Sequence, residues 1–203
     1  MKLKLTPELS YIIGFWKETK TKEGIGVSGT EERLSIFVKA VMAAGLTEPT
    51  KLLASSPKEP EEPKEEPKEE PKEGPKEEEP EEDPLAPEIS SIYFYHTSYR
   101  KFFQKVLEDE LERFQYRNEY SASFLAGLFD SVGLISEDGK TYFTRYTPKD
   151  EMLLYRLGFN SIRRKRKLYL QRPLKFLEYI KPFTKKYVTH PVFAKIKPRQ
   201  QGV

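Results

Sequence analysis

The chain has 203 residues and a formal net charge of only +3, but this average hides an uneven distribution. Residues 57–84 contain 5 Lys against 14 Asp and Glu, whereas residues 161–203 contain 13 Lys and Arg against a single acid, Glu178. A segment this basic favours a polyanionic partner over a small neutral substrate. The absence of Cys excludes disulfides, thiolate metal sites and cysteine nucleophiles, and two His residues are too few for an imidazole metal centre.

The composition also indicates where the protein works. No apolar run approaches the roughly 18 residues that span a membrane, and the first residues lack the apolar core of a signal peptide. We therefore expect a cytoplasmic protein. The abundance of Lys, Arg and Glu beside only two Asn is typical of a thermophile.

The first 56 residues predict two helices separated by a short strand. Thr6 and Pro7 form a typical helix start, and apolar residues then recur at helical spacing: Leu9, Ile12, Ile13 and Trp16. The glycine-rich residues 24–29 predict a strand. Thr30 is the expected start of a second helix, and Gly45 its expected end.

Residues 57–84 predict a different state. They contain four near-copies of a Pro-Lys-Glu-Glu tetrad and no aromatic or branched apolar residue, so they cannot bury enough surface to offset the entropy lost on ordering. We expect a disordered, extended acidic insertion. It could serve as a passive spacer or as an acidic decoy for the basic part of the chain.

The remainder predicts regularly alternating elements. They are a strand at 89–97, a helix over Tyr99–Phe114, a helix from Ser121 to Val132, a hairpin around Asp138-Gly139, a helix from Thr147 to Gly158, a very basic hairpin at 162–171 and a helix over Pro173–Phe183. The second half therefore has the order helix, hairpin, helix, hairpin, helix. The first half fits the same order if the acidic segment interrupts a hairpin, which predicts two copies of one unit.

This duplication sets the expected domain boundaries. The first repeat comprises residues 1–56 and 85–117, and the acidic insertion at 57–84 interrupts it. The second repeat comprises residues 118–184, and a basic tail follows at 185–203.

One segment carries a recognisable motif. Phe124–Gly133 reads FLAGLFDSVG and resembles the signature of the LAGLIDADG homing endonuclease family, and Leu9–Lys20 resembles a degenerate first copy. The resemblance implies an α+β fold of two αββαββα-like repeats, with the signature helices packed along a pseudo-twofold axis and two sheets forming a saddle over duplex DNA. Gly14, Gly127 and Ser131 are the small residues expected where these helices cross, because small residues let two backbones approach closely.

The catalytic pattern of the family does not transfer to this chain. Its nucleases place one metal-binding acid per repeat just before the last residue of the motif, and here those positions are Thr19 and Val132. Neither suits Mg²⁺, which prefers anionic oxygen ligands. The alternative acids are displaced, Glu18 by one residue and Asp130 by two, or about 200° around a helix. The expectation leans against an enzyme and against any cofactor, with Mg²⁺ needed only if cleavage survives.

Basic residues supply the expected binding surface, because Lys and Arg contact phosphates without reading sequence. The candidates lie in the second repeat and the tail: Lys140, Arg145, Arg163, Arg164, Lys165, Arg166, Lys167, Arg172, Lys185 and Lys186. On a two-stranded ribbon, alternate basic side chains could enter a major groove.

The leading hypothesis is a monomer that binds nucleic acid, double-stranded DNA in preference to structured RNA, without cutting it. Three alternatives remain open. They are a structured-RNA binder of the maturase or ribosome-associated kind, a metal-dependent endonuclease that uses displaced acids, and a protein scaffold whose acidic arm is the active part.

Overall fold

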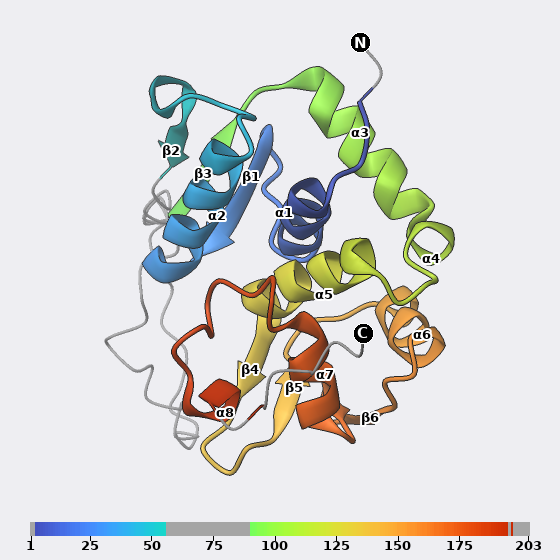
Figure 1. Cartoon of the computed structure of the whole chain (residues 1–203). Coiled ribbons are helices and arrows are strands. Elements are labelled where there is room, and N and C mark those ends of the chain that lie inside the picture. Colours follow the sequence, from blue (N-terminus) through green and yellow to red (C-terminus); the bar gives the residue numbers. More distant parts are fainter. Residues whose placement is uncertain (1–2, 56–89, 195, 197–203) are drawn as a thin grey trace, which may run out of the picture.

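The computed structural model describes residues 3–55, 90–194 and 196, which form two helix-and-sheet halves around a central pair of helices (Figure 1). The first half contains α1 (Pro7–Lys17), β1 (Ile25–Gly29), α2 (Glu31–Ala43), the short 3₁₀ helix η1 (Pro49–Lys51), β2 (Leu53–Ser55), β3 (Ser90–Phe94), α3 (Thr97–Glu108) and α4 (Glu110–Arg113). The second contains α5 (Glu119–Val132), β4 (Gly133–Ile135), β5 (Thr141–Phe143), α6 (Pro148–Arg156), β6 (Ser161–Arg164), β7 (Lys167–Leu170), α7 (Pro173–Ile180) and α8 (Pro191–Ala194). The predicted acidic insertion lies outside the described residues.

The central helices α1 and α5 are buried on nearly every side. The Thr6 hydroxyl accepts a hydrogen bond from the Leu9 amide at 3.2 Å and caps α1, and Asn118 with Ser121 forms a capping box at the start of α5. All residues from Leu9 to Trp16 and from Ser121 to Val132 are buried. A helix that is buried all round belongs to the core rather than to a surface layer.

Glycine permits the two helices to touch backbone to backbone. A methyl group on Gly14 would come within 2.1 Å of the Phe124 carbonyl oxygen, and one on Gly127 within 2.0 Å of the Tyr11 carbonyl oxygen. The two contacts are reciprocal, since each carbonyl belongs to the residue three positions before the other glycine. Gly14 and Gly127 therefore lie where the backbones of α1 and α5 approach each other closely. Ser131 is also buried, but its hydroxyl donates to the Leu128 carbonyl of its own helix.

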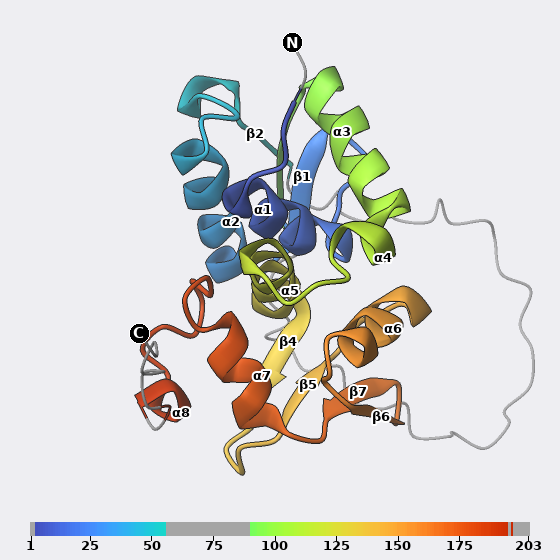
Figure 2. The same cartoon turned by 45° about the vertical axis from the view of Figure 1, so that its right-hand side comes forward.

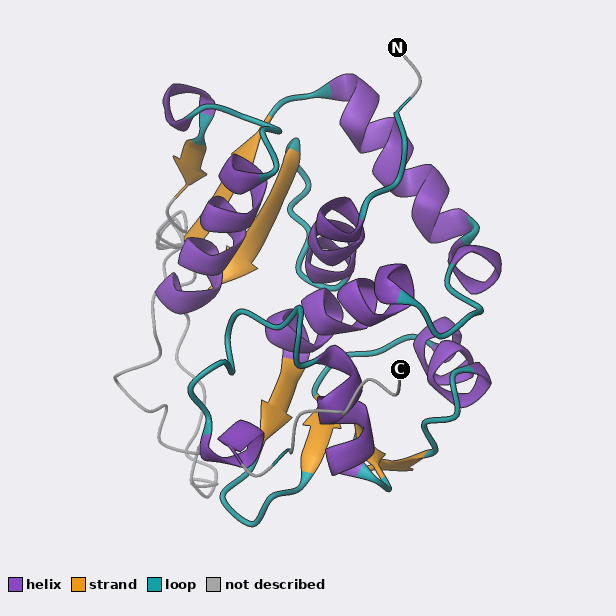
Figure 3. Ribbon diagram, viewed as in Figure 1, coloured by secondary structure: helices purple, strands orange, loops and turns teal. Residues whose placement is uncertain are grey.

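Each central helix leads into its own antiparallel sheet. The first sheet has the strand order β1-β3-β2 and the second has the order β4-β5-β7-β6 (Figure 3). The amide of Ser28 donates to the Thr19 carbonyl at 2.9 Å, and the amide of Thr144 donates equivalently to the Val132 carbonyl at 2.9 Å. The first sheet is one strand shorter because only an isolated bridge between Lys20 and Val27 stands where the second repeat has β4.

One face of each sheet packs against the core. In the first half Phe15 stacks on Phe37 of α2, and in the second Phe129 and Phe143 both meet Phe176 of α7 edge to face. Two views of the chain show α2 beside the first sheet and α7 beside the second (Figures 1 and 2). No helix in the described part of the chain is long and apolar enough to cross a membrane.

The structure departs from the expected elements at both ends of α3. The single helix expected over Tyr99–Phe114 is broken at Asp109, which separates α3 from α4. His96 was expected in a strand, but its ring nitrogen Nδ1 accepts from the Tyr99 amide at 3.4 Å and caps α3. The break lets Glu110 enter the core, where it is 1% exposed.

Alanine at either crossing glycine should separate the central helices. We expect Gly14→Ala and Gly127→Ala each to lower the free energy of unfolding by more than about 3 kcal/mol, since a methyl group at 2 Å from a backbone oxygen forces the core to shift. Gly158→Ala is the matched control. Gly158 has a positive φ of 76° but open space around it, so its loss should remove only about 1 kcal/mol. Equal effects in urea denaturation would contradict the close crossing.

Candidate nucleic-acid interface

The two motif positions that carry the catalytic acids in the resembled family lie at the ends of the central helices. Thr19 is 2% exposed and its hydroxyl donates to the Phe15 carbonyl at 2.9 Å. Val132 is 3% exposed and is the last residue of α5. Neither side chain offers an anionic oxygen.

Asp130 is tied into the core rather than available as a ligand. Its Oδ2 accepts from the Tyr11 hydroxyl at 2.8 Å and from the Lys185 and Lys186 amides at 2.6 and 3.2 Å. Its Oδ1 accepts from the Thr184 hydroxyl at 2.5 Å. Burial raises the pKa of Asp130 above its ordinary value, against the lowering effect of these hydrogen bonds. The carboxylate therefore fastens the loop after α7 to both central helices.

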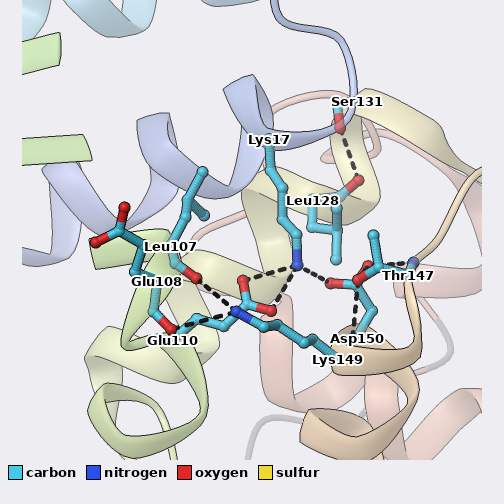
Figure 4. Close-up of polar contacts among 9 residues, drawn as sticks. All are labelled: Lys17, Leu107, Glu108, Glu110, Leu128, Ser131, Thr147, Lys149 and Asp150. Carbon is cyan, nitrogen blue, oxygen red and sulfur yellow. Dashed lines mark hydrogen bonds and ion pairs between the residues drawn. The ribbon is translucent and has the colours of Figure 1, made fainter. Parts of the chain in front are cut away.

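A second buried charge cluster surrounds the end of α1 (Figure 4). The Lys17 ammonium lies 2.7 Å from Glu110 Oε2 and 2.7 Å from Asp150 Oδ1. The other Asp150 oxygen accepts from the Thr147 amide at 2.7 Å and caps α6. Burial raises the pKa of the neighbouring Glu18, and the charge of Asp150 raises it further. Lys17 thus holds α4 and α6 against α1.

These residues do not fit the divalent metal that the resemblance implies. Thr19 and Val132 lack the charge, and all the oxygens of Asp130 already accept hydrogen bonds. Within the described ranges, no group of three or more His, Cys, Asp or Glu could hold a metal ion. We therefore derive no metal-dependent step for this chain.

The open face of the second sheet gathers aromatic and basic side chains. Cross-strand partners share a face, so pairing of Leu134 with Tyr142, Tyr142 with Tyr169, and Tyr169 with Ile162 forms a row across the sheet. The Tyr142 and Tyr169 rings lie 5.0 Å apart, and the Lys167 ammonium lies 4.6 Å above the Tyr142 ring. Arg164 pairs with Lys167 on this face.

The tip of the β6–β7 hairpin has an unusual backbone. Lys165 and Arg166 join the strands and have φ values of 44° and 61°. A two-residue turn with both φ values positive is the type I′ geometry, which normally selects Asn-Gly. The left-handed conformation costs an ordinary residue about 1–2 kcal/mol. Beside the tip is a surface hollow of about 430 Å³, whose lining includes Lys140, Arg164 and Lys165.

Three of the expected binding residues lie away from this face. Arg163 pairs with Leu168, whose side chain is in the core, and its guanidinium binds Glu151 of α6. Lys185 is exposed and Lys186 is partly buried. The Lys185 ammonium lies 4.8 Å from the Tyr11 ring, and that of Lys186 lies 4.0 Å from Glu32. Burial lowers the pKa of both lysines.

The other expected residues are exposed, apart from Lys167, which is half-buried. Arg172 precedes α7 and Arg145 follows β5. Arg145 lies close enough to Arg33 of α2 to lower its pKa, although burial of Arg33 lowers that pKa more. Arg33 of the first repeat therefore lies near Arg145 of the second repeat. The sequence did not identify Arg33 as a candidate binding residue, because it lies in the first turn of an ordinary helix.

No protein-family model matches the sequence, and no curated protein matches it. Solved structures do. A variant of the homing endonuclease I-DmoI, crystallised with its target DNA in the presence of manganese, aligns with a TM-score of 0.50 and 13% identity, over 92% of this chain and 97% of that one. A mesophilic variant of I-DmoI aligns with a TM-score of 0.49 and 12% identity, over 86% of this chain and 94% of that one.

The chain has the LAGLIDADG endonuclease fold. The two halves described above are its repeats, and α1 and α5 are its two signature helices. The expected α+β fold of two repeats is thereby confirmed. The I-DmoI match spans 92% of this chain, and the first sheet is one strand shorter than the second.

Removal of the Asp130 carboxylate should destabilise the protein strongly. We expect Asp130→Ala to lower the free energy of unfolding by more than about 3 kcal/mol, because four donors lose their acceptor inside the core. Asp130→Asn should lose only about 1 kcal/mol, since its amide oxygen can replace Oδ2 while its NH₂ donates to Thr184. Urea denaturation measures both. A stable Asp130→Ala protein would show that the carboxylate has no structural role.

Proposed function

We propose that the protein is a monomer that binds double-stranded nucleic acid, preferentially DNA, through the open face of the second sheet, and that it does not cleave its target. The observation that carries this proposal is the Lys165–Arg166 turn. Two cations hold left-handed conformations at a hairpin tip where Asn-Gly would be relaxed.

The β6–β7 hairpin also brings two like charges together, which destabilises the isolated protein. Arg164 and Lys167 are directly paired across the strands, and like charges in this position repel. A phosphate backbone would relieve the repulsion, since each phosphate neutralised by Lys or Arg also releases counterions. Because a polyanion would remove this repulsion, the pairing of Arg164 with Lys167 supports a polyanionic partner.

The open face of the first sheet lacks the basic residues of the second. Its open face carries small or neutral side chains: Gly26, Ser28, Leu53, Ser55, Ser91 and Tyr93. None of these described residues is Lys or Arg. We therefore expect an asymmetric footprint, with the second repeat making most phosphate contacts and the first lying closer to neutral groups of the nucleic acid.

The expected lack of cleavage rests on the side chains present at the motif positions. Thr19 and Val132 offer no carboxylate, and the core uses Asp130. In the complexes of I-DmoI with DNA, the related fold is a nucleic-acid binder as well as a nuclease scaffold. A binding surface can persist when the acid pair does not, because the two depend on different residues.

One observation favours structured RNA as a second candidate. Tyr142 and Tyr169 form an aromatic pair on the open face with Lys167 above it, and such platforms stack unpaired bases. On duplex DNA the same rings can contact only sugar or groove atoms. Parallel titrations with a duplex and with a stem-loop RNA distinguish the two.

Relaxing the turn should stabilise the fold and weaken binding. For Lys165→Asn with Arg166→Gly, we expect the free energy of unfolding to rise by about 1–2 kcal/mol, because Asn-Gly adopts the turn without strain. Duplex affinity should fall, and the slope of log K against log salt should become shallower by up to about 2, or 0.9 for each lost phosphate contact.

A variant with the same loss of charge provides the control. Lys101→Gln with Lys105→Gln removes two exposed cations from α3 and should leave the salt slope unchanged. If both double variants weaken binding equally, only net charge matters and the hairpin is not the contact surface.

Supercoiled plasmid should remain intact when the protein is added with Mg²⁺ or Mn²⁺ at concentrations that saturate binding. Gel electrophoresis detects the nicked and linear products. Metal-dependent nicking that is lost in Glu18→Gln would overturn the non-cleaving assignment and identify Glu18 as a displaced ligand. Nicking by a contaminating nuclease would instead be unchanged in the Glu18→Gln preparation.

A further inference from the structure

A basic hollow lies at the end of α1, outside the sheet surface described above. It has a volume of about 660 Å³ and lies between α1, α3 and the start of α6. Its walls carry Trp16 and four cations, Lys20, Lys22, Arg100 and Lys149. Among the described residues that line it, Glu108 is the one acid, so the lining has a net charge of +3.

Two of the cations are held in place by backbone carbonyls. The Lys149 ammonium donates to the carbonyls of Leu107 and Glu108 at 3.3 and 3.2 Å (Figure 4). The Arg100 guanidinium donates to the Lys22 carbonyl at 3.1 Å. An ammonium has three N–H donors and a guanidinium has five, so both groups keep further donors for a ligand. Neutral carbonyls fix these cations without neutralising their charge.

Trp16 adds a wall that suits a nucleotide-sized ligand. Its ring lies 5.9 Å from the Lys20 ammonium, and its side chain is buried. The indole N–H has no acceptor within the described part of the chain, and a buried donor without an acceptor costs about 1–3 kcal/mol. The volume lies within the range of small-molecule sites, about 300–1,000 Å³.

We propose that this hollow binds a phosphate group, either on a free nucleotide or in a nucleic-acid strand that extends beyond the second sheet. Phosphate oxygens accept several charge-assisted hydrogen bonds at once, and Lys20, Arg100 and Lys149 all line this hollow. Lys149 belongs to the second repeat and the other cations to the first. A bound phosphate therefore connects the two repeats.

Trp16 makes the test direct because it is the only tryptophan in the chain. Inorganic phosphate and then AMP are titrated at constant ionic strength while Trp16 emission is recorded. We expect a saturable change in emission. Lys20→Gln combined with Lys149→Gln should raise the apparent Kd at least tenfold, whereas the exposed Lys105→Gln should leave it unchanged.

Two further arms identify the source of the phosphate. If duplex DNA changes Trp16 emission and AMP competes with it, the ligand is a strand; if only AMP acts, the ligand is a free nucleotide. The Lys165→Asn, Arg166→Gly variant should still bind AMP, so failure of the sheet proposal would not be mistaken for failure of this one. No saturable change with any probe, or equal Kd values in all lysine variants, would overturn the proposal.

Discussion

The rest of the structure depends on the direct backbone contact between α1 and α5. At Gly14 and Gly127 no side chain separates the helices, so each glycine faces the carbonyl three residues before the other. This fixes the helices in one register, because a slip in either direction would bring a residue with a side chain to the crossing. The chain therefore enters the sheet in the same way in both repeats. The Thr19 carbonyl accepts from the Ser28 amide, and the Val132 carbonyl accepts from the Thr144 amide.

The same register explains why two charges are buried beside the crossing. Lys17 and Asp130 both lie three residues after a crossing glycine, and each is satisfied by elements outside its own helix. Lys17 binds carboxylates of α4 and α6, whereas Asp130 binds Tyr11 and the loop after α7. Burial opposes ionisation of Asp130 and Glu110 and raises the pKa of both. Each charge is therefore committed to positioning outer elements, which explains why an acid inside the motif need not be a metal ligand.

The regular elements could be predicted because local signals were strong. Local sequence preference agrees with the folded structure at three such signals: the helix caps Thr6 and Thr147 and the turn residue Gly139. The break at Asp109 could not be predicted, since the apolar spacing continues through it and the contacts beside it are tertiary: Glu110 pairs with Lys17, and Lys149 binds the Leu107 and Glu108 carbonyls. The basic hairpin at 162–171 was predicted as part of the alternating helix and hairpin order, and its charge predicted a polyanionic partner. The conformation of its Lys165–Arg166 turn was not predicted, because Lys-Arg is not a typical turn sequence. That Arg163 lies on the opposite sheet face from Arg164 becomes clear only once the strand pairing is known.

The two sheets differ in strand number and in the cations that they carry. In the first repeat a single bridge at Lys20 replaces a strand, and the shortened connection brings Lys20 and Lys22 beside α3 instead of onto the sheet. In the second repeat the full set of strands keeps Lys167 and Arg164 on the open face. Lys20 and Lys22 of the first repeat therefore line the hollow at the end of α1, whereas Arg164 and Lys167 of the second repeat lie on its sheet. The two repeats therefore present different cationic surfaces, one beside the central helix and one on the sheet, although their central helices meet through equivalent contacts.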